Sequence, residues 1–533
     1  MVQMAKRIKK LRWAFLALGS AAFLVAGQPP NADDLIWQKS VRKFDARRKA
    51  VLQEVDQEAR VGPFQPNWSS LKGYQVPDWY LDAKFGIFIH WGVYAVPAFG
   101  SEWYPRNMYL QGTKDFQHEV AVHGPQTQFG YKDFIPQFRA GHFDPRAWAE
   151  LFRKAGAKYV IPVAEHHDGF AMYESELSDW NARQMGPKRD LVGELAKAVR
   201  AEGLHFGASS HRAEHYFFMN GGREFPSDVQ DPKYAAFYGP AHAGVTDKNG
   251  QKWAAHPDAA YLNDWLARTA EIVKRYDPEV LWFDWWINTK EFEPYLQRLA
   301  AFYYNDAARR HSTAVINYKY TAYPDNAAVL DIERGQLDAS RSLFWQTDTS
   351  VSIKSWGYIE NDQFRSPESL IQQLVDIVSK NGCLLLNIGP KPDGAIPEQA
   401  QQILLDMGRW LSVNGEAIYG TRPWDVSGEG PTKVAGGAFH DTATKPYSGQ
   451  DIRFTKRGNT LYAIALAWPD DGRLTVKSLA QGSSGGGVAI KTIRLLGSNT
   501  PIKWTRDENG LHLQLPAQKV GEYAYVFKLS PDR

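Results

Sequence analysis

Short apolar runs that alternate with amphipathic helical stretches dominate the middle of this 533-residue chain. Continuous apolar runs are typical of strands buried on both faces of a parallel sheet, and the intervening helices cover those faces. About 350 residues follow this rhythm, and no glycine-rich dinucleotide loop follows any strand. We therefore expect an α/β fold whose main domain is a (β/α)8-like barrel rather than an open sheet. The predicted strands are 85–90, 159–164, 204–208, 280–284, 314–318 and 383–388, and the predicted helices are 145–156, 190–201, 261–276 and 368–379.

The rhythm changes near residue 424, where short alternating strands are separated by turn residues such as those at 457–459, 470–472 and 509–510. This pattern predicts a C-terminal antiparallel β-sandwich, which could serve as a buttress or as a sugar-binding module. Its expected strands are 452–455, 461–467, 474–477, 493–496, 512–515 and 523–529. The predicted domains are a signal peptide (1–27), an N-terminal leader helix region (28–70), the barrel (71–423) and the sandwich (424–533).

The N-terminus has the three parts of a secretory signal. Five positive charges lie within residues 6–12, an apolar run fills 13–26, and Gly27 precedes Gln28 and two prolines. The 14-residue run is short for a membrane span of about 20 residues, although an uncleaved anchor remains the alternative. We expect cleavage after Gly27 and no membrane association of the mature protein.

The net charge and the number of cysteines limit which partners and which cellular compartment we expect for the protein. Removing the five positive charges of residues 1–27 takes the formal net charge from +3 to −2, so no electrostatic case for nucleic acid remains. Cys383 is the single cysteine, which excludes an intrachain disulfide and favours a bacterial periplasm over a eukaryotic extracellular space. The sequence predicts a periplasmic or secreted protein and does not indicate its oligomeric state.

Polar side chains gather where the predicted barrel strands end, which is where barrel enzymes carry their reactive groups. Asp284 ends an apolar strand among tryptophans, where a carboxylate is costly to bury without a role. His90, His166, His167 and His211 follow other strands and could bind metal, bind sugar hydroxyls or fill the core. The adjacent pair His166 and His167 is a poor chelate, and neither an HExxH motif nor a calcium loop occurs, so we expect no metal and no cofactor. The 19 tryptophans suit either a sugar-binding surface or a large core.

Six segments of the chain resemble those of a known protein family. KFGIFIHWGVYAVPAFGSEWYPRNMY (84–109), AKYVIPVAEHHDGFAMYESELSDWNA (157–182), GPKRDLVGELAKAVRAEGLHFG (186–207), VLWFDWW (280–286), WQTDTSVSIKSWGY (345–358) and LLLNIGPKPDGAIP (384–397) resemble the α-L-fucosidases of glycoside hydrolase family 29. The resemblance runs in order over about residues 60–425. It implies a retaining exo-glycosidase that removes terminal α-L-fucose from oligosaccharides or glycoconjugates through a covalent fucosyl-enzyme intermediate.

The resemblance also assigns expected roles. Asp284 matches the family's nucleophile. Fucose lacks a 6-hydroxyl, so its methyl group needs an apolar wall, for which Phe88 and Trp356 are the expected residues. The other expected substrate-binding residues are His90, Glu102, Trp103, His166, His167 and Trp282.

The acid/base is expected to be Glu333, in a loop after the strand at 314–318. Burial would raise its pKa so that it starts as an acid. Some relatives carry a glutamate where this chain has Gln346, and glutamine cannot transfer the proton. The alternative for Glu333 is an ion pair with Arg334 or another surface cation. Two departures from the family, His211 in the run SSHR and Lys319, leave the roles of those residues open.

Three rival functions remain open at this point. The same fold and mechanism could act on a related sugar such as an α-L-galactoside, whose extra hydroxyl the wall of Phe88 and Trp356 would penalise. A non-catalytic carbohydrate-binding protein would require the loss of Asp284 or Glu333, and both are present. A metallohydrolase would lose activity with a chelator. The loops at 212–260 and 320–345 are expected to set linkage and aglycone preference, and the first is long enough to form a rim or lid.

Overall fold

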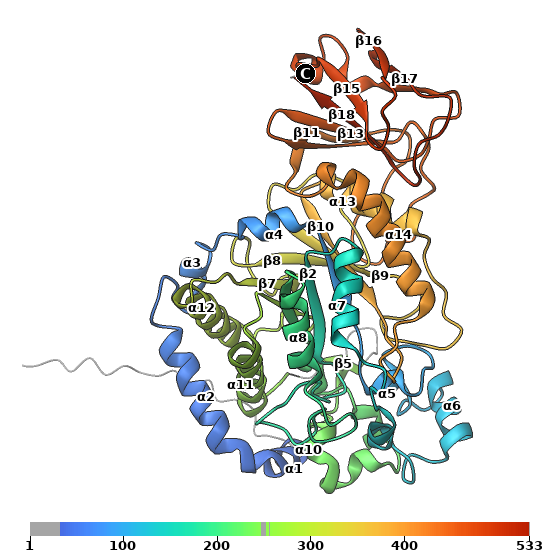
Figure 1. Cartoon of the computed structure of the whole chain (residues 1–533). Coiled ribbons are helices and arrows are strands. Elements are labelled where there is room, and N and C mark those ends of the chain that lie inside the picture. Colours follow the sequence, from blue (N-terminus) through green and yellow to red (C-terminus); the bar gives the residue numbers. More distant parts are fainter. Residues whose placement is uncertain (1–31, 247–251, 255, 532–533) are drawn as a thin grey trace, which may run out of the picture.

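Eight parallel strands close into a barrel, which confirms the predicted fold class (Figure 1). The computed structural model describes residues 32–246, 252–254 and 256–531. Around the barrel the strand order is β1-β10-β9-β8-β7-β6-β3-β2. Their bounds are β1 Phe85–Ile89, β2 Tyr159–Glu165, β3 His205–Ser210, β6 Val280–Phe283, β7 Val315–Lys319, β8 Val329–Glu333, β9 Trp345–Ser350 and β10 Gly382–Ile388. A separate pair, β4 Val245–Thr246 and β5 Lys252–Ala254, lies in the long connection after β3.

Helices cover the outside of the barrel in the expected alternation. They are α7 Pro145–Lys154, α8 Leu191–Ala201, α11 Ala259–Tyr276, α12 Glu293–Arg309, α13 Pro367–Ser379 and α14 Glu398–Asn414. Side chains of Asp144, Asp190, Asp258 and Ser366 accept hydrogen bonds from the first-turn amides of α7, α8, α11 and α13, so the local sequence fixes where these helices begin. Shorter helices lie in the connections: α5 Tyr104–Asn107, α6 Lys114–His123, α9 Arg212–His215 and α10 Ala235–Tyr238.

The barrel departs from strict alternation on one side. Neither the β7–β8 connection (320–328) nor the β8–β9 connection (334–344) contains a helix. The expectation that Glu333 lies in a loop is wrong, because Glu333 is the last residue of β8. Strands β8 (VLDIE) and β9 (WQTDTS) carry several polar side chains, so they lack the continuous apolar run that identified the other strands.

The N-terminal leader packs on the barrel helices (Figure 1). Helix α2 (Asp45–Glu58) lies against α11 and α12, with Val51 and Val55 buried in the same core as those helices. Arg48 adds an ion pair to the buried Asp264 on α11 at 2.8 Å. The other leader helices are α1 Ala32–Val41, α3 Trp68–Leu71 and α4 Asp78–Ala83. The predicted signal peptide, 1–27, lies outside the described residues.

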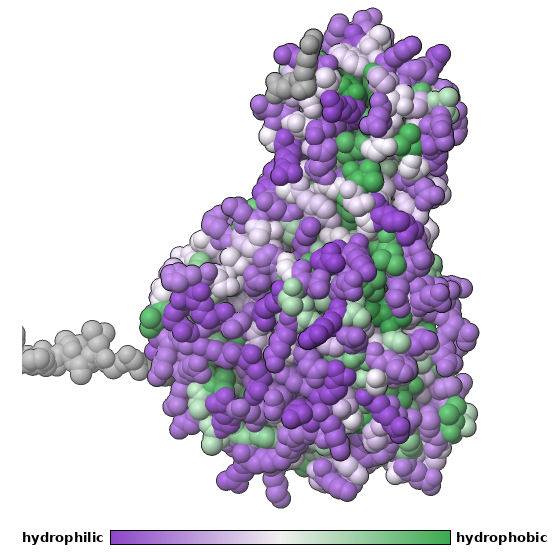
Figure 2. All heavy atoms as spheres, in the orientation of Figure 1, coloured by the Kyte–Doolittle hydropathy of each residue, from purple (hydrophilic) through white to green (hydrophobic). Residues whose placement is uncertain are grey.

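The C-terminal strands form two antiparallel sheets that share one apolar core. One sheet has the order β11-β12-β13-β18-β15 and the other β14-β17-β16. Their bounds are β11 Arg422–Glu429, β12 Ile452–Arg457, β13 Thr460–Ala465, β14 Arg473–Val476, β15 Thr492–Leu495, β16 Lys503–Asp507, β17 Gly510–Gln514 and β18 Tyr525–Ser530. Phe454 and Leu513 are buried in the core between the sheets. Figure 2 shows that the surface is polar over most of the face of the molecule that it displays. Among the described residues, no helix is long and apolar enough to cross a membrane.

Candidate active site

A cavity of about 560 Å³ opens at the carboxyl ends of the barrel strands. Nine of the expected site residues line it: His90, Glu102, Trp103, His166, His167, Trp282, Asp284, Glu333 and Trp356. The tenth, Phe88, is fully buried behind this lining, with its ring 4.7 Å from that of Trp282 and 4.6 Å from that of His90. Of the expected apolar wall, Trp356 therefore reaches the cavity, and Phe88 supports the residues in front of it.

Asp284 follows β6 directly, and its carboxylate is held in place through one of its two oxygens. Its Oδ2 atom accepts hydrogen bonds from Nδ1 of His211 at 3.0 Å and from Nε2 of His167 at 3.3 Å. Burial alone would raise the pKa of Asp284, but the hydrogen bonds from His167 and His211 and the charge of Lys319 hold it well below its usual range. The carboxylate is therefore ionised, its orientation is fixed, and its Oδ1 atom is the oxygen left for chemistry.

His167 carries positive charge beside that carboxylate. Its Nδ1 atom lies 3.1 Å from Oε2 of the buried Glu214 and 3.0 Å from the main-chain oxygen of His211. Burial would lower the pKa of His167, but the charges of Glu214 and Asp284 raise it to about 9. Glu214 thus acts through His167, and it belongs to α9, which begins at Arg212, the last residue of the SSHR run.

The other three histidines form a neutral group at the base of the cavity. Burial and neighbouring histidines lower the pKa values of His90, His166 and His211 below the ordinary range. Nδ1 of His90 donates to Oδ1 of Asn387 at 2.8 Å, which leaves Nε2 as an acceptor. Nδ1 of His166 and Nε1 of Trp282 are buried and find no protein partner in the described part of the chain. Such unpaired polar atoms suit a ligand that brings its own hydroxyl groups.

Two triads could be considered for a metal ion, His90–His166–His211 and His167–His211–Asp284, whose candidate ligand atoms lie within 4.8 Å of one another. Both triads need His211. Its two ring nitrogens already bond Asp284 and Ser209, each at 3.0 Å. The arrangement fits hydrogen bonding to a hydroxylated ligand better than metal coordination.

Glu333 enters the cavity from the end of β8. Its Oε2 atom accepts hydrogen bonds from Nε1 of Trp285 and from Nζ of Lys319, the latter at 3.0 Å. Burial raises the pKa of Glu333 to about 7, with Lys319 opposing the rise and the charges of Asp284 and Asp348 adding to it. Glu333 is paired with buried Lys319, while the neighbouring Arg334 donates to main-chain oxygens of Ser352 and Ser355.

Lys319 holds three carboxylates together beneath the cavity. Its Nζ atom lies 3.0 Å from Glu333, 3.1 Å from Asp348 and 3.7 Å from Asp331. The same ammonium group sits 4.9 Å from the ring of Trp282. Burial and the nearby charge of Asp331 raise the pKa of Asp348 well above its ordinary value. Glu333 and Asp348 therefore share the single positive charge of Lys319.

Trp356 is fixed by its main chain as well as by its ring. Oε2 of Glu102 accepts from the amide of Trp356 at 2.8 Å, and Asn387 donates to its main-chain oxygen at 2.7 Å. The ring stacks on His90 at 5.1 Å, and the guanidinium of Arg334 lies 4.6 Å from it on the cavity rim. Glu102 thus positions Trp356 through its backbone.

A segment after β11 returns to the cavity. The amide of Phe439 donates to the main-chain oxygen of Glu333 at 2.9 Å, and the amide of Gly437 donates to that of Gln336 at 2.8 Å. The ring of Phe439 lies 5.8 Å from that of Trp285 and lines the opening. A residue from beyond the last barrel helix therefore contributes to the site.

Sequence reasoning left Lys319 and His211 without roles and did not name Asp348, Glu214 or Phe439. A signal for Asp348 was present, because alternate residues of a strand share a face and Asp348 lies two positions after Gln346. Gln346 itself lies deeper in the barrel, where it accepts hydrogen bonds from Tyr80 at 2.6 Å and Tyr159 at 2.8 Å. No local pattern marks Glu214 or Phe439, whose roles depend on contacts made far along the chain.

Known proteins match the chain over nearly its whole length. The family model for alpha-L-fucosidase matches residues 51–416, and that for the alpha-L-fucosidase C-terminal domain matches residues 445–530. The tissue alpha-L-fucosidase of Homo sapiens is 32% identical over 487 residues, covering 88% of this chain and 92% of the relative. The alpha-L-fucosidase of Branchiostoma floridae is 31% identical and covers 87% and 95%. The crystal structure of the Thermotoga maritima alpha-fucosidase in complex with fucose superposes with a TM-score of 0.68 at 29% identity, covering 87% of this chain and all of that one.

Proposed function

The chain belongs to the alpha-L-fucosidase family, and we propose that Asp284 and Glu333 are the nucleophile and the acid/base with which it releases fucose. The enzyme is a glycoside hydrolase that removes terminal α-L-fucose from fucosylated glycans. One observation carries the assignment of the two residues. Both line the same cavity, and their surroundings push their pKa values in opposite directions, as a pair with separate acid/base and nucleophile roles requires.

In the first half-reaction Oδ1 of Asp284 attacks the anomeric carbon of fucose. The glycosidic carbon–oxygen bond breaks as Glu333 gives its proton to the departing oxygen, so the aglycone leaves as a neutral alcohol. His167 and His211 keep Oδ2 occupied and aim the attacking oxygen. The product is a fucosyl ester of Asp284, and Glu333 is left ionised beside Lys319.

In the second half-reaction the ionised Glu333 takes a proton from water. The resulting oxygen attacks the anomeric carbon, and the bond to Oδ1 of Asp284 breaks. Fucose is released with the anomeric configuration of the substrate, and both carboxyl groups return to their starting states. A pKa of about 7 suits Glu333 to both proton transfers.

The neutral histidines and the tryptophans supply sugar recognition in this proposal. Nε2 of His90 and the unpaired Nδ1 of His166 accept from sugar hydroxyls, and Nε1 of Trp282 donates to one. Glu102 and Trp103 line the same cavity, and His167 acts on the sugar through the carboxylate of Asp284, to which it donates. Trp356 offers the apolar face for the methyl group of fucose, with Phe88 packed behind it.

The test is hydrolysis of an aryl α-L-fucoside by residues 28–533, beside the variant Asp284→Gly. We expect turnover by the wild-type enzyme, a loss of about 10³-fold or more in the variant, and partial rescue by azide, which fills the space of the missing carboxylate. Asp277→Gly is the matched control. Asp277 has φ 47° at the end of α11, a conformation that glycine adopts easily, so the variant Asp277→Gly should keep full activity.

Other outcomes would redirect the assignment. Full activity in Asp284→Gly would remove Asp284 as the nucleophile. A wild-type enzyme that ignores the fucoside but cleaves an aryl α-L-galactoside would point to the related sugar, because only the galactoside carries the extra hydroxyl.

Export to the periplasm is also proposed. The basic segment at 6–12, the apolar run at 13–26 and Gly27 support it. Mass spectrometry of the protein recovered from a bacterial host should find Gln28 as the first residue. An intact N-terminus in the membrane fraction would instead indicate an uncleaved anchor.

A further inference from the structure

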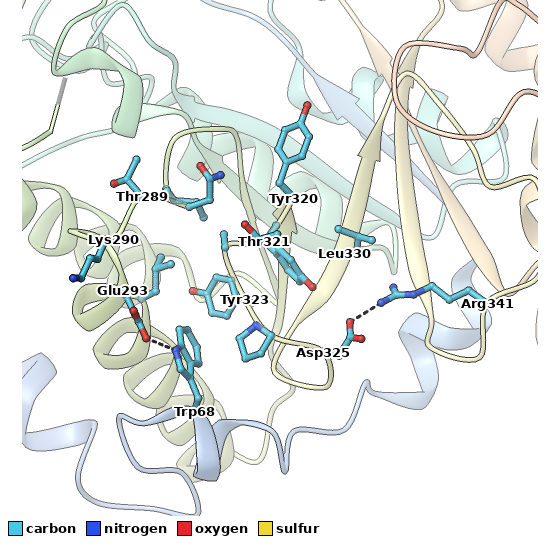
Figure 3. A pocket seen from close by; sticks show the side chains of 16 residues that line it. Trp68, Thr289, Lys290, Glu293, Tyr320, Thr321, Tyr323, Asp325, Leu330 and Arg341 are labelled. Atoms are coloured by element: carbon cyan, nitrogen blue, oxygen red, sulfur yellow. Dashed lines mark hydrogen bonds and ion pairs between the residues drawn. The ribbon is translucent and has the colours of Figure 1, made fainter. Parts of the chain in front are cut away.

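A second cavity of about 460 Å³ lies where strands β7 and β8 face helix α12 (Figure 3). Its walls come from the loops after β6 and β7, and Trp68 of the N-terminal leader closes one side. The volume falls within the range of about 300–1,000 Å³ typical of small-molecule sites. Nothing in the proposed reaction uses this cavity.

Aromatic rings dominate one side of the second cavity. The rings of Trp68 and Tyr323 meet edge to face at 5.5 Å, and the ring of Tyr318 lies 5.4 Å from that of Tyr323. Tyr323 is 2% exposed, yet its hydroxyl group has no hydrogen-bond partner within the described residues. Figure 3 shows this hydroxyl directed into the cavity, toward the side formed by Lys290 and Glu293. A buried hydroxyl left unpaired at a cavity wall is a group that a bound ligand can satisfy.

The charged groups of the cavity are largely used by the protein itself. Asp325 pairs with Arg341 at 2.7 Å, and Glu293 accepts a hydrogen bond from Nε1 of Trp68 at 2.8 Å, as Figure 3 shows. The site therefore does not concentrate charge of one sign, as a phosphate or sulfate would require. Aromatic faces together with dipolar groups such as Asn288 and Thr321 fit a neutral, polyhydroxylated ligand.

One pair of rings separates this cavity from the catalytic one. Trp285 lines the catalytic cavity and donates from Nε1 to the acid/base carboxylate of Glu333. Its ring meets that of Tyr320 edge to face at 4.9 Å, and Tyr320 lines the second cavity. A leaving group protonated by Glu333 would depart beside Trp285, so a chain of sugars that continued past Tyr320 would reach the second cavity.

We propose that the second cavity binds a neutral sugar of the leaving glycan, at a distance from the fucose that is cleaved. The inference rests on the proposed function and narrows its substrate class to extended fucosylated oligosaccharides. Trp68 and Tyr323 are the contact residues, with the tryptophan face against the sugar ring and the tyrosine hydroxyl bonded to one of its oxygens. An aryl fucoside or a fucosyl disaccharide ends before the second cavity and gains nothing from it.

The test compares kcat/KM for an aryl α-L-fucoside and for a neutral fucosylated oligosaccharide of five or more sugars. Tyr323→Phe removes only the unpaired hydroxyl group, so we expect no loss of thermal stability. If this hydroxyl group did not contact the substrate, kcat/KM would be unchanged with both substrates. We expect about a three- to tenfold lower kcat/KM for the oligosaccharide, which is the worth of one neutral hydrogen bond, and an unchanged value for the aryl fucoside. Trp68→Ala should lower the oligosaccharide value about tenfold, again with the aryl fucoside unchanged.

Trp504→Ala is the matched control, because Trp504 is another half-buried tryptophan and lies in the C-terminal sheets. It should leave the ratio of the two kcat/KM values as in the wild type. Equal effects of Tyr323→Phe on both substrates, or no effect on either, would overturn the distal sugar site while fucose release stands. A wild-type enzyme inactive on both substrates would instead overturn the proposed function itself.

Discussion

Replacing Lys319 by methionine should move the alkaline limb of the pH profile upward. The Lys319 side chain is 3% exposed, and its Nζ atom lies 3.0 Å from Oε2 of Glu333. In the wild type its positive charge stabilises the ionised form of Glu333 and so opposes the rise in pKa that burial causes. Methionine keeps most of the side-chain volume and removes the charge, so the pKa of Glu333 must rise above its value of about 7.

The size of the shift can be bounded from the geometry. Two unit charges 3.0 Å apart interact by about 5.5 kcal/mol at an effective dielectric constant of about 20, which corresponds to about 4 pKa units. Lys319 also forms ion pairs with Asp348 and Asp331. In the methionine variant, protons taken up by those carboxyl groups would replace part of the lost positive charge. We therefore expect an upward shift of more than about one unit and less than about four.

The sign follows from the role of Glu333 as the acid. Activity is lost as pH rises through the pKa of Glu333, so a higher pKa keeps the acid protonated and carries that limb from near pH 7 to above about pH 8. Asp284 also loses a nearby cation, so its acidic limb should rise, but hydrogen bonds from His167 and His211 remain to limit the change.

The assay is kcat/KM for an aryl α-L-fucoside between pH 4 and pH 10, because this ratio reports the ionisations of the free enzyme. Lys319→Arg keeps the charge and should keep the alkaline limb near that of the wild type. Circular dichroism and thermal melting verify that both variants fold. An alkaline limb in Lys319→Met that stays in place or moves to lower pH would refute either the role of Glu333 or its coupling to Lys319.

Four further results are expected. Glu333→Gln should lower kcat/KM on a natural fucoside by about 10²–10⁴-fold, with a smaller loss on an aryl fucoside whose leaving group needs no proton; equal losses on both would contradict the acid role. Phe439→Ala should lower kcat/KM about two- to fivefold by loosening Trp285 while the melting temperature stays unchanged, and an unaltered rate would separate this ring from the site. Glu165→Gln should cost about 3–5 kcal/mol of unfolding free energy in urea, because it leaves two buried arginines poorly paired, and a loss below about 1 kcal/mol would show that water reaches them. Prolonged treatment with a chelator should leave hydrolysis of the aryl fucoside intact, whereas loss that added zinc restores would revive the metal alternative.

The barrel was predictable from sequence wherever its strands are wholly apolar. The runs at 85–90, 159–164 and 383–388 coincide closely with β1, β2 and β10, because strands covered on both faces must be apolar throughout. Strands β8 and β9 were not predicted, because polar residues interrupt that pattern. These residues are Asp331, Glu333, Gln346 and Asp348. The strands that are hardest to predict are thus those that carry the proposed acid/base and its charged neighbours.

The candidate site was predictable residue by residue but not as an electrostatic unit. Motifs with a family resemblance named Asp284 and His167, the glutamine at position 346 favoured Glu333 as the acid/base, and all three residues line one cavity. Their pKa values depend on Lys319 and on Glu214, which lie far from their partners in sequence and come close only when strands and helices close the barrel. Local pattern carries no information about such pairs, because the sign and size of each shift depend on distance and burial.

The missing helices on one side of the barrel account for the reach of the C-terminal part into the site. In most of the barrel a helix lies between successive strands, but none lies in 320–328, between β7 and β8, or in 334–344, between β8 and β9. Residues 437–441 run along this uncovered stretch, with the amides of Gly437, Phe439 and Asp441 donating to the main-chain oxygens of Gln336, Glu333 and Arg334 at 2.8–2.9 Å. The added backbone fixes the end of β8, from which the Glu333 side chain enters the cavity, and Asp441 ties the same segment to buried Arg365 at 3.3 Å. The C-terminal region therefore does more than buttress the barrel, because part of it completes the wall that carries Glu333, the proposed acid/base.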